Sequence, residues 1–373
     1  MHNSGLLDIM KTGSIEKNRV ADWSTLLAEA NSHMVTELVA YYARSAPEGC
    51  IPPEIMESLN KAYKRNFLYT MLAADETEKA LAALDAAGIR CMVLKGTRLA
   101  ERLYGDQAAR KSVDIDLLVE EHNLEKAASV LDSLGFIDMG NWGRIPTRLG
   151  LISNHLMYKK NTAMGCLYFE LHFHLTDGRG KEINMHEIWD RAIKVQVGQT
   201  KAYDLSPRDF LLYLCIHSAN HNYCVLRHVL DVAAALKLEG QQINWSDFIH
   251  TAKKYHASIR VYSSLFYAGL LLEAPVPAWV LEELQPASYL RNRLDLECLP
   301  DRPPTGLTEI TRRLVRYEGI AGGLTEAWQA VFPPEAKMRL LYNIDSTACV
   351  CFYYPRRWLD LFRKMRRVTA NNG

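Results

Sequence analysis

The stretch "CMVLKGTRLAERLYGDQAARKSVDIDLLVEE", residues 91–121, contains two aspartates, Asp114 and Asp116, inside an apolar run typical of a buried β-strand. Side chains alternate between the two faces of a strand, so residues at i and i+2 leave the same face. Two carboxylates this close oppose folding unless a cation lies between them. Mg²⁺ is such a cation, because it takes carboxylate oxygens together with phosphate oxygens and water. The spacing therefore predicts a metal site on this strand.

A second signal lies earlier in the same stretch. The apolar run "IRCMVL" ends at Leu94 and is followed by Lys95, Gly96 and Thr97, which open the helical pattern "TRLAERLY". Gly96 lets the backbone approach closely, and the free N–H groups at a helix start suit a phosphate. The Thr97 hydroxyl and the Lys95 ammonium are further donors. A D-x-D pair alone also occurs by chance at exposed strand edges, but its combination with this turn is more specific.

A third carboxylate belongs to a hairpin predicted over residues 151–175. Its second arm, "CLYFELHFHL", alternates Glu170, His172 and His174 with apolar residues. We expect Glu170 to complete the metal site from a neighbouring strand. The two histidines bind phosphate or relay a proton, or they serve only as hydrogen-bond partners of the carboxylate. The prediction fails if Glu170 faces away from the aspartates, or if a lysine ion pair fills the gap between them.

The composition of the whole chain is that of a folded protein. Its 373 residues are 48% hydrophobic and 23% charged, with a net charge of +1, so no global field favours nucleic acid or a membrane surface. Eight cysteines without CxxC spacing, several of them in apolar runs, favour reduced thiols. The start has no signal-peptide core and no run of eighteen apolar residues occurs, so we expect a cytoplasmic protein without a membrane span.

Helical and strand-like patterns follow one another along the chain. Apolar residues recur at helical spacing before residue 88 and again from Ser206 to about 285, and strand-like and helical runs alternate between these regions. A proline-rich loop is predicted over 286–306. The predicted fold class is α+β, a small mixed sheet flanked by helical regions at both ends. The predicted units are a mobile N-terminus (1–18), an N-terminal helical region (19–87), a core that contains the mixed sheet (88–204) and a C-terminal helical domain (205–373).

Over about residues 88–236 the sequence resembles the uncharacterised bacterial nucleotidyltransferase family of the polymerase-β superfamily. The segments that resemble it are "VLKGTRLAERLY", "DIDLLV", "FELHFHL" and "CIHSANHNYCVLRHVLDVAAAL". The resemblance implies catalytic and metal-binding roles for Asp114, Asp116 and Glu170. It implies nucleotide binding by Lys95, Gly96, Thr97, Arg110, His172, His217, His221, Arg227 and Asp231.

Two departures from the family pattern stand out. Thr97 replaces the usual serine or glycine of the turn, and the spacing from Gly96 to Asp114 is longer than in the minimal pattern. The segment "YGDQAARKS" must therefore form an extra loop. That loop either carries Arg110 to the triphosphate or is a surface insertion.

Two further patterns allow more than one interpretation. His217 and His221 are four residues apart, a helical spacing that zinc can use, but no HExxH glutamate lies between them. A helix face that closes over the nucleotide is the favoured interpretation, and a packed polar seam is nearly its equal. The tail "RRWLDLFRKMRRV" has an apolar stripe of Trp358, Leu359, Phe362 and Met365. It favours a docked terminal helix over a membrane or nucleic-acid contact.

The resemblance implies a nucleotidyltransferase that uses two Mg²⁺ ions and an NTP, with ATP favoured. It moves an NMP to an oxygen of an acceptor and releases pyrophosphate. Relatives lie beside genes for natural-product and modified-peptide biosynthesis, which implies a small-molecule or peptide acceptor. The alternatives are an aminoglycoside-type antibiotic adenylyltransferase, a non-catalytic nucleotide-binding protein and a toxin that modifies tRNA. Nucleic acid is not an expected partner, because the composition indicates no basic groove.

Overall fold

A computed structural model describes residues 5–16, 20–139, 154–162, 165–176, 183–221, 223, 225–286, 328, 331–333, 335, 338, 342, 344 and 349–360. A mixed sheet of seven strands lies at its centre, in the order β3-β4-β5-β2-β1-β7-β6. The strands are β1 (Cys91–Val93), β2 (Asp114–Val119), β3 (Ile137–Asp138), β4 (His155–Thr162), β5 (Gly165–His172), β6 (Ile193–Val197) and β7 (Thr200–Asp204). The β2–β5 and β1–β7 pairs are parallel and the others are antiparallel.

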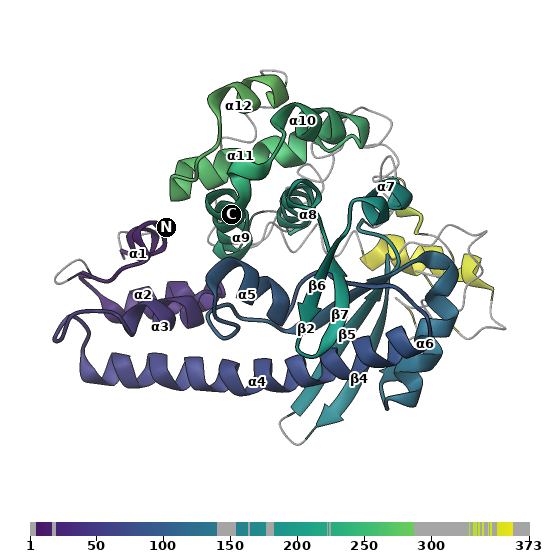
Figure 1. The fold of residues 1–373 in the computed structure, drawn as a ribbon, viewed down its shortest axis with the longest axis horizontal. Helices are drawn as coiled ribbons and strands as arrows, with labels where there is room; N and C mark the ends of the chain where they lie inside the picture. The colour runs from purple at the N-terminus through teal and green to yellow at the C-terminus, as the bar shows by residue number, and fades with distance from the viewer. Residues whose placement is uncertain are drawn as a thin grey trace.

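Helices precede, interrupt and follow the strands. They are α1 (Leu6–Thr12), α2 (Trp23–Ser32), α3 (Thr36–Ala43), α4 (Pro53–Ala86), α5 (Thr97–Tyr104), α6 (Leu124–Ser133), α7 (Met185–Asp190), α8 (Pro207–Asn220), α9 (Leu226–Glu239), α10 (Trp245–Lys254), α11 (Ser258–Leu272) and α12 (Ala278–Leu284). In Figure 1, α4 runs along one side of the sheet and α8 to α12 lie on the other. The predicted α+β class with a mixed sheet is confirmed.

The two faces of the sheet belong to two hydrophobic cores. Ile115 and Leu117 of β2 and Phe169 of β5 join one core, together with buried residues of α4 and α6. Met92 of β1 and Leu118 of β2 join the other, which is formed mostly by helices from both ends of the chain. The second face is therefore the one on which the neighbours of Leu118 on β2, Asp114 and Asp116, leave the strand.

Both cores cross the region boundaries predicted from the sequence. The helix α4 precedes residue 88 and yet covers the sheet, and α1 to α3 pack in one core with α8 to α11. The boundaries themselves stay predictions. Residues 5–16 differ from the predicted mobile segment, because α1 buries Leu6, Ile9 and Met10.

Buried ion pairs join the sheet to the C-terminal helices. Arg102 of α5 donates to Asp204 of β7 at 2.8 Å and to Glu239 of α9 at 2.7 Å. All three side chains are largely buried, so losing one partner would leave a charge uncompensated inside the protein. These contacts hold α5, and with it the Gly96 turn, at a set position relative to the sheet.

Most predicted elements are present, with some differences. The hairpin forms as β4 and β5, and α8 begins after Ser206, whose side chain accepts from the backbone N–H of Asp209. The strands β3, β6 and β7 were not predicted. The helical pattern before residue 88 is interrupted between α2 and α3, where Met34 adopts φ 57°. The predicted proline-rich loop lies outside the described residues from position 287 onward.

The cysteine prediction is correct for Cys50, Cys91, Cys166 and Cys215, which are free. It is wrong for Cys349 and Cys351, which form a disulfide. None of the helices in the described ranges combines the length and the apolar character needed to cross a bilayer.

The tail prediction of a docked apolar stripe is not supported by the two stripe residues that the structure describes, because Trp358 and Leu359 are both exposed. Trp358 makes local contacts only: its Nε1 donates to the Val331 carbonyl at 3.2 Å, and its ring contacts that of Phe332. Phe362 and Met365 lie outside the described residues.

Candidate functional site

The register of β2 and β5 brings together the three acidic side chains, which we call the carboxylate cluster: Asp114, Asp116 and Glu170. Asp116 lies directly opposite Glu170 in the parallel pair. One ligand oxygen of each side chain lies within 4.8 Å of the others. Glu170 therefore faces the two aspartates, as the sequence predicts.

The Gly96 turn lies against the start of β2. Gly96 adopts φ 68°, and a Cβ atom at this position would lie 3.3 Å from the carbonyl oxygen of Asp114. The backbone N–H of Leu94 donates to the Asp116 carbonyl at 3.1 Å. A side chain at position 96 would meet both a strained backbone conformation and this close approach. The first N–H groups of α5 therefore lie beside the carboxylate cluster.

Lys95 forms an ion pair inside the carboxylate cluster. Its Nζ lies 2.8 Å from Oδ1 of Asp116. A lysine ion pair that fills the gap between the carboxylates would contradict a metal site. The Lys95 ion pair, however, occupies only one oxygen of Asp116. Oδ2 of Asp116 is fully buried and has no hydrogen-bond partner among the described residues, and no ion pair is formed there by Asp114. The lysine thus compensates one oxygen of Asp116 and leaves Asp114 without an ion pair among the described residues.

His172 links two of the carboxylates. Its Nε2 lies 3.1 Å from Oδ1 of Asp116 and 3.2 Å from Oε2 of Glu170. Burial alone would lower the pKa of His172, but the hydrogen bonds to Asp116 and Glu170 raise it above its ordinary value. His172 is therefore a hydrogen-bond partner of the carboxylates, which is one of the two roles predicted for it. Phosphate binding or proton relay by His172 stays a prediction.

The two aspartates titrate in opposite directions. Burial, followed by the charge of Asp116, raises the pKa of Asp114 to about 6. Burial also favours the protonated form of Asp116, but Lys95 and His172 outweigh it and lower the pKa of that carboxyl below its ordinary range. Asp116 is therefore a compensated anion and Asp114 an uncompensated one.

These features fit a bound divalent cation. The donors are carboxylate oxygens, which are the ligands that Mg²⁺ takes in proteins. A buried acceptor without a partner, such as Oδ2 of Asp116, costs free energy until something satisfies it. Asp114, Asp116 and Glu170 are the residues that would hold the ion.

The loop that carries Arg110 is fixed from within. Nδ2 of Asn66 on α4 donates to the carbonyls of Ala108 and Arg110 at 2.8 and 3.2 Å. Ala108, Ala109 and Arg110 are all buried, so the predicted alternative of a surface insertion is wrong.

Arg110 and Asp231 form a buried bidentate pair. Nε and Nη2 of Arg110 each lie 2.8 Å from a carboxylate oxygen of Asp231. Both were predicted to bind the nucleotide, and in this structure each is the partner of the other. Tyr104 also approaches Asp231, with its hydroxyl 3.5 Å from Oδ1. Nucleotide contact by Arg110 or Asp231 stays a prediction.

Arg227 is a cation without a carboxylate partner in the part of the chain that the structure describes. Its Nη1 donates to the Lys111 carbonyl at 2.8 Å, and its Nε is buried with no hydrogen-bond partner there. Burial, followed by the charge of Arg110, lowers the pKa of Arg227 to about 10. An anion at this position would relieve both penalties, which agrees with the predicted contact to a triphosphate.

The structure separates the predicted histidines. His174 lies beyond the end of β5, and its ring contacts the backbone of Thr176 instead of the carboxylates. His217 and His221 lie at the end of α8, where they meet His228, which the sequence analysis missed. His155 of β4 was also missed; its Nε2 lies 3.8 Å from Oε1 of Glu170. Antiparallel pairing of the predicted hairpin was the available signal for His155, since it faces His172.

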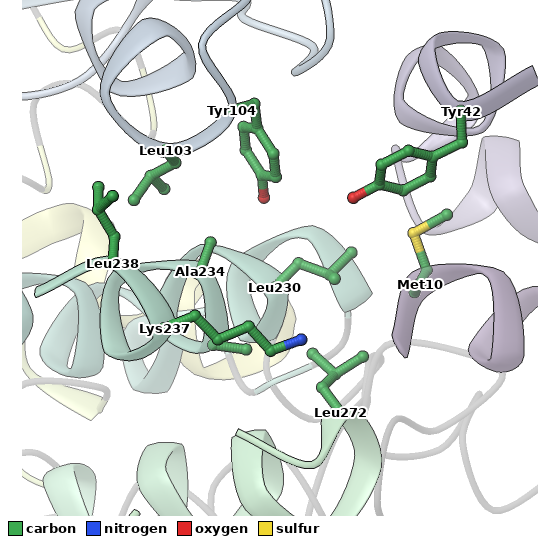
Figure 2. A pocket seen from close by; sticks show the side chains of 10 residues that line it. Met10, Tyr42, Leu103, Tyr104, Leu230, Ala234, Lys237, Leu238 and Leu272 are labelled. Carbon is green, nitrogen blue, oxygen red and sulfur yellow. The ribbon is translucent and has the colours of Figure 1, made fainter. Parts of the chain in front are cut away.

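A cavity of about 290 Å³ lies among α1, α3, α5, α9 and α11. Figure 2 shows the hydroxyls of Tyr42 and Tyr104 and the ammonium of Lys237 directed into an otherwise apolar space. The cavity contains none of the predicted site residues. Tyr104 alone connects it to them, through Asp231.

The sequence matches the protein family described as "Uncharacterised nucleotidyltransferase" over residues 19–273, more than half of the chain. The chain belongs to this family. It is therefore a nucleotidyltransferase, and the resemblance predicted from its motifs is confirmed over a longer range than 88–236. Its substrate is accordingly a nucleoside triphosphate.

Two solved structures are similar to this nucleotidyltransferase at low identity. The solution structure of the antibiotic-resistance factor ANT(2'')-Ia is 16% identical, covers 54% of this chain and 95% of its own, and has a TM-score of 0.34. The crystal structure of an antigenic nucleotidyltransferase-like protein from Paracoccidioides brasiliensis is 15% identical, covers 59% and 92%, and has a TM-score of 0.36. TM-scores this low carry no argument about this chain. A comparison with curated proteins finds no match.

Proposed function

We propose that this nucleotidyltransferase transfers an NMP from an NTP, with ATP favoured, to an oxygen of a small-molecule or peptide acceptor. The observation that carries the proposal is the carboxylate cluster, because Asp114, Asp116 and Glu170 converge from paired strands and are only partly compensated by Lys95. Two bound Mg²⁺ ions would neutralise the triphosphate and activate the attacking oxygen. We also propose that the reaction is part of natural-product biosynthesis, and this part of the proposal rests on the family resemblance alone.

The residues around the carboxylate cluster suit a triphosphate. The first N–H groups of α5, after Gly96, are donors for phosphate oxygens, and the Thr97 hydroxyl lies at the same helix start. Arg227 supplies an uncompensated positive charge. Lys95 supplies another once it is released from Asp116.

The reaction requires an in-line displacement at the α-phosphorus. An acceptor oxygen forms a new bond to phosphorus, the bond to the bridging oxygen breaks, and pyrophosphate leaves with the electron pair. The acceptor proton passes to Glu170, which His172 orients by its hydrogen bond of 3.2 Å. Positioning and charge neutralisation account for most of the rate in this chemistry.

The test combines binding with turnover. Calorimetry with ATP, in the presence and absence of Mg²⁺, measures whether nucleotide binding requires the ion. Pyrophosphate release with candidate hydroxyl acceptors measures transfer. We expect Asp116→Asn to abolish release and Glu125→Gln, an exposed change on α6, to preserve it. Unchanged release by Asp116→Asn would contradict the proposal.

A further inference from the structure

Three imidazoles converge where α8 ends and α9 begins, and we call them the histidine cluster: His217, His221 and His228. One ring nitrogen of each lies within 4.8 Å of the others. The ring centroids are 4.6 Å apart for His217 and His221, 4.9 Å for His217 and His228, and 4.5 Å for His221 and His228. No other three-histidine group of this kind occurs among the described residues.

The histidine cluster contains a buried ring nitrogen that no described residue satisfies. His228 is 3% exposed, and its Nδ1 has no hydrogen-bond partner among the described residues. A buried polar atom of this kind costs free energy unless water or an ion meets it. His221, in contrast, is exposed, so the cluster is open to solvent on one side.

The three imidazoles offer the ligand chemistry that transition metals use most. Neutral imidazole binds a metal ion through either ring nitrogen. The unpartnered Nδ1 of His228 is therefore one candidate ligand atom.

The positive charges near the histidine cluster are mostly compensated. Lys95 is paired with Asp116, and Arg110 is paired with Asp231. Arg227 is the remaining cation, and its Nη1 donates to a backbone carbonyl. The repulsion that a dication would meet is therefore smaller than the number of basic residues indicates.

We propose that His217, His221 and His228 bind one divalent transition-metal ion of the Zn²⁺ class. Three histidines around zinc leave a fourth position for water or a substrate atom. Nitrogens around a tetrahedral ion lie about 3.4 Å apart, so small rotations of the three rings complete the site. The ion ties the last turn of α8 to the first turn of α9 and is distinct in ligand chemistry from the oxygen-ligated ions of the carboxylate cluster.

Tyr213 places the two clusters close to each other on α8. It lies four residues before His217, and the two rings stack with centroids 6.0 Å apart. The charges of Lys95, Asp116 and Glu170 also act on the pKa of the Tyr213 hydroxyl. A metal ion at the histidine cluster would therefore lie near the carboxylate cluster without sharing any of its three residues.

The test is a Co²⁺ titration of the full chain after treatment with a chelator. Co²⁺ takes zinc sites and absorbs visible light strongly when four-coordinate. We expect saturable absorption at one ion per chain, displacement by Zn²⁺ and no displacement by excess Mg²⁺. Loss of second-shell partners weakens metal binding about 10–100-fold, and loss of a ligand should exceed this, so His221→Ala and His228→Ala should weaken Co²⁺ binding more than about 100-fold.

Two controls keep the outcome unambiguous. His250→Ala changes an exposed histidine on α10 and should leave Co²⁺ binding unchanged. Asp114→Asn removes a member of the carboxylate cluster and should keep the Co²⁺ absorption, which separates this proposal from the proposed function. If His228→Ala does not fold, His221→Ala carries the test, because position 221 is exposed. Absence of saturable absorption in the wild type, or equal Co²⁺ affinity of His221→Ala and wild type, overturns the metal site.

Discussion

The carboxylate cluster and the histidine cluster each bring three ligand atoms within 4.8 Å of one another, yet they are built in opposite ways. The first uses the two-residue period of β2 and its register with β5. The second uses the four-residue spacing on α8 and the packing of a second helix. The first cluster is charged, whereas burial keeps His217 and His228 of the second neutral.

This difference shows how each cluster limits the electrostatic repulsion between its buried side chains. Carboxylates in a buried position repel one another, so the carboxylate cluster contains Lys95 and His172. Neutral imidazoles repel one another only weakly and need no counter-charge. The four predictions below test this contrast, from the largest expected effect to the smallest.

Asp114→Asn should have the largest effect and only on the carboxylate cluster. It removes the uncompensated carboxylate, so we expect pyrophosphate release to fall by roughly 10²–10³-fold or more. A steady-state assay measures this, and a Co²⁺ titration of the same variant should be unchanged. Equal losses of release and of Co²⁺ binding would show that the two clusters form one site.

Lys95→Met should reveal that lysine and metal share Asp116. Removing one partner of a buried pair costs about 3–5 kcal/mol, so the metal-free variant should lose that much free energy of unfolding. Mg²⁺ should then raise the melting temperature of Lys95→Met more than that of the wild type. Lys79→Met is the control, because its pairs with Asp75 and Glu76 involve an exposed lysine and add little stability. Equal Mg²⁺ shifts in Lys95→Met and the wild type would contradict the sharing.

The pH dependence of stability should have opposite signs at the two clusters. The pKa of Asp114 is raised to about 6 in the folded protein, so its contribution is present at low pH and is lost as pH rises from about 4 through 6. In the absence of metal, the free energy of unfolding of Asp114→Asn should therefore exceed that of the wild type by on the order of 2 kcal/mol above pH ~6. Below pH ~4 the two free energies should differ little.

The pKa values of His217 and His228 are lowered, so their contribution is present above the ordinary value of 6.5 and is lost as pH falls below it. Denaturant unfolding at a series of pH values, with His228→Ala beside the wild type, measures this second window. An advantage of Asp114→Asn over the wild type that grows as pH falls, or an advantage of the wild type over His228→Ala that grows as pH falls, would contradict the assigned burial.

Gly96→Ala should have the smallest effect, about 1–2 kcal/mol of stability. Gly88→Ala is a matched control, because Gly88 adopts φ 72° but an added Cβ would contact nothing within 4 Å. The difference between the two variants isolates the contact of residue 96 with the Asp114 carbonyl. Equal losses would mean that the turn does not press against β2.

The sequence predicted the carboxylate cluster well for a physical reason. Asp114 and Asp116 are two residues apart, and an alternating strand places them on one face without any tertiary information. Glu170 required only that its strand lie beside theirs. The sequence did not predict Lys95 as the partner of Asp116, because a charge near a carboxylate is equally compatible with phosphate binding.

Other site residues depended on packing that no local pattern contains. Arg110 was expected at the triphosphate or on the surface, and nothing in the sequence indicated that Asp231, 121 residues later, would pair with it. His228 was not singled out, because nothing in "CVLRHVLDV" says that its ring will meet those of the preceding helix. The strand β6 was missed because none of its residues is buried, and β7 was missed because its two buried positions are Ala202 and Asp204, which give no apolar alternation.

The sequence by itself determined the periodic features: which residues form β2, α5 and α8, which face of β2 is acidic, and the family to which the chain belongs. These depend on interactions between residues close in the chain or on motifs that can be read in order. Only the tertiary structure decided which charges are compensated and which histidines meet. Burial and long-range contacts set the cost of a charge, and both exist only once distant segments have packed together.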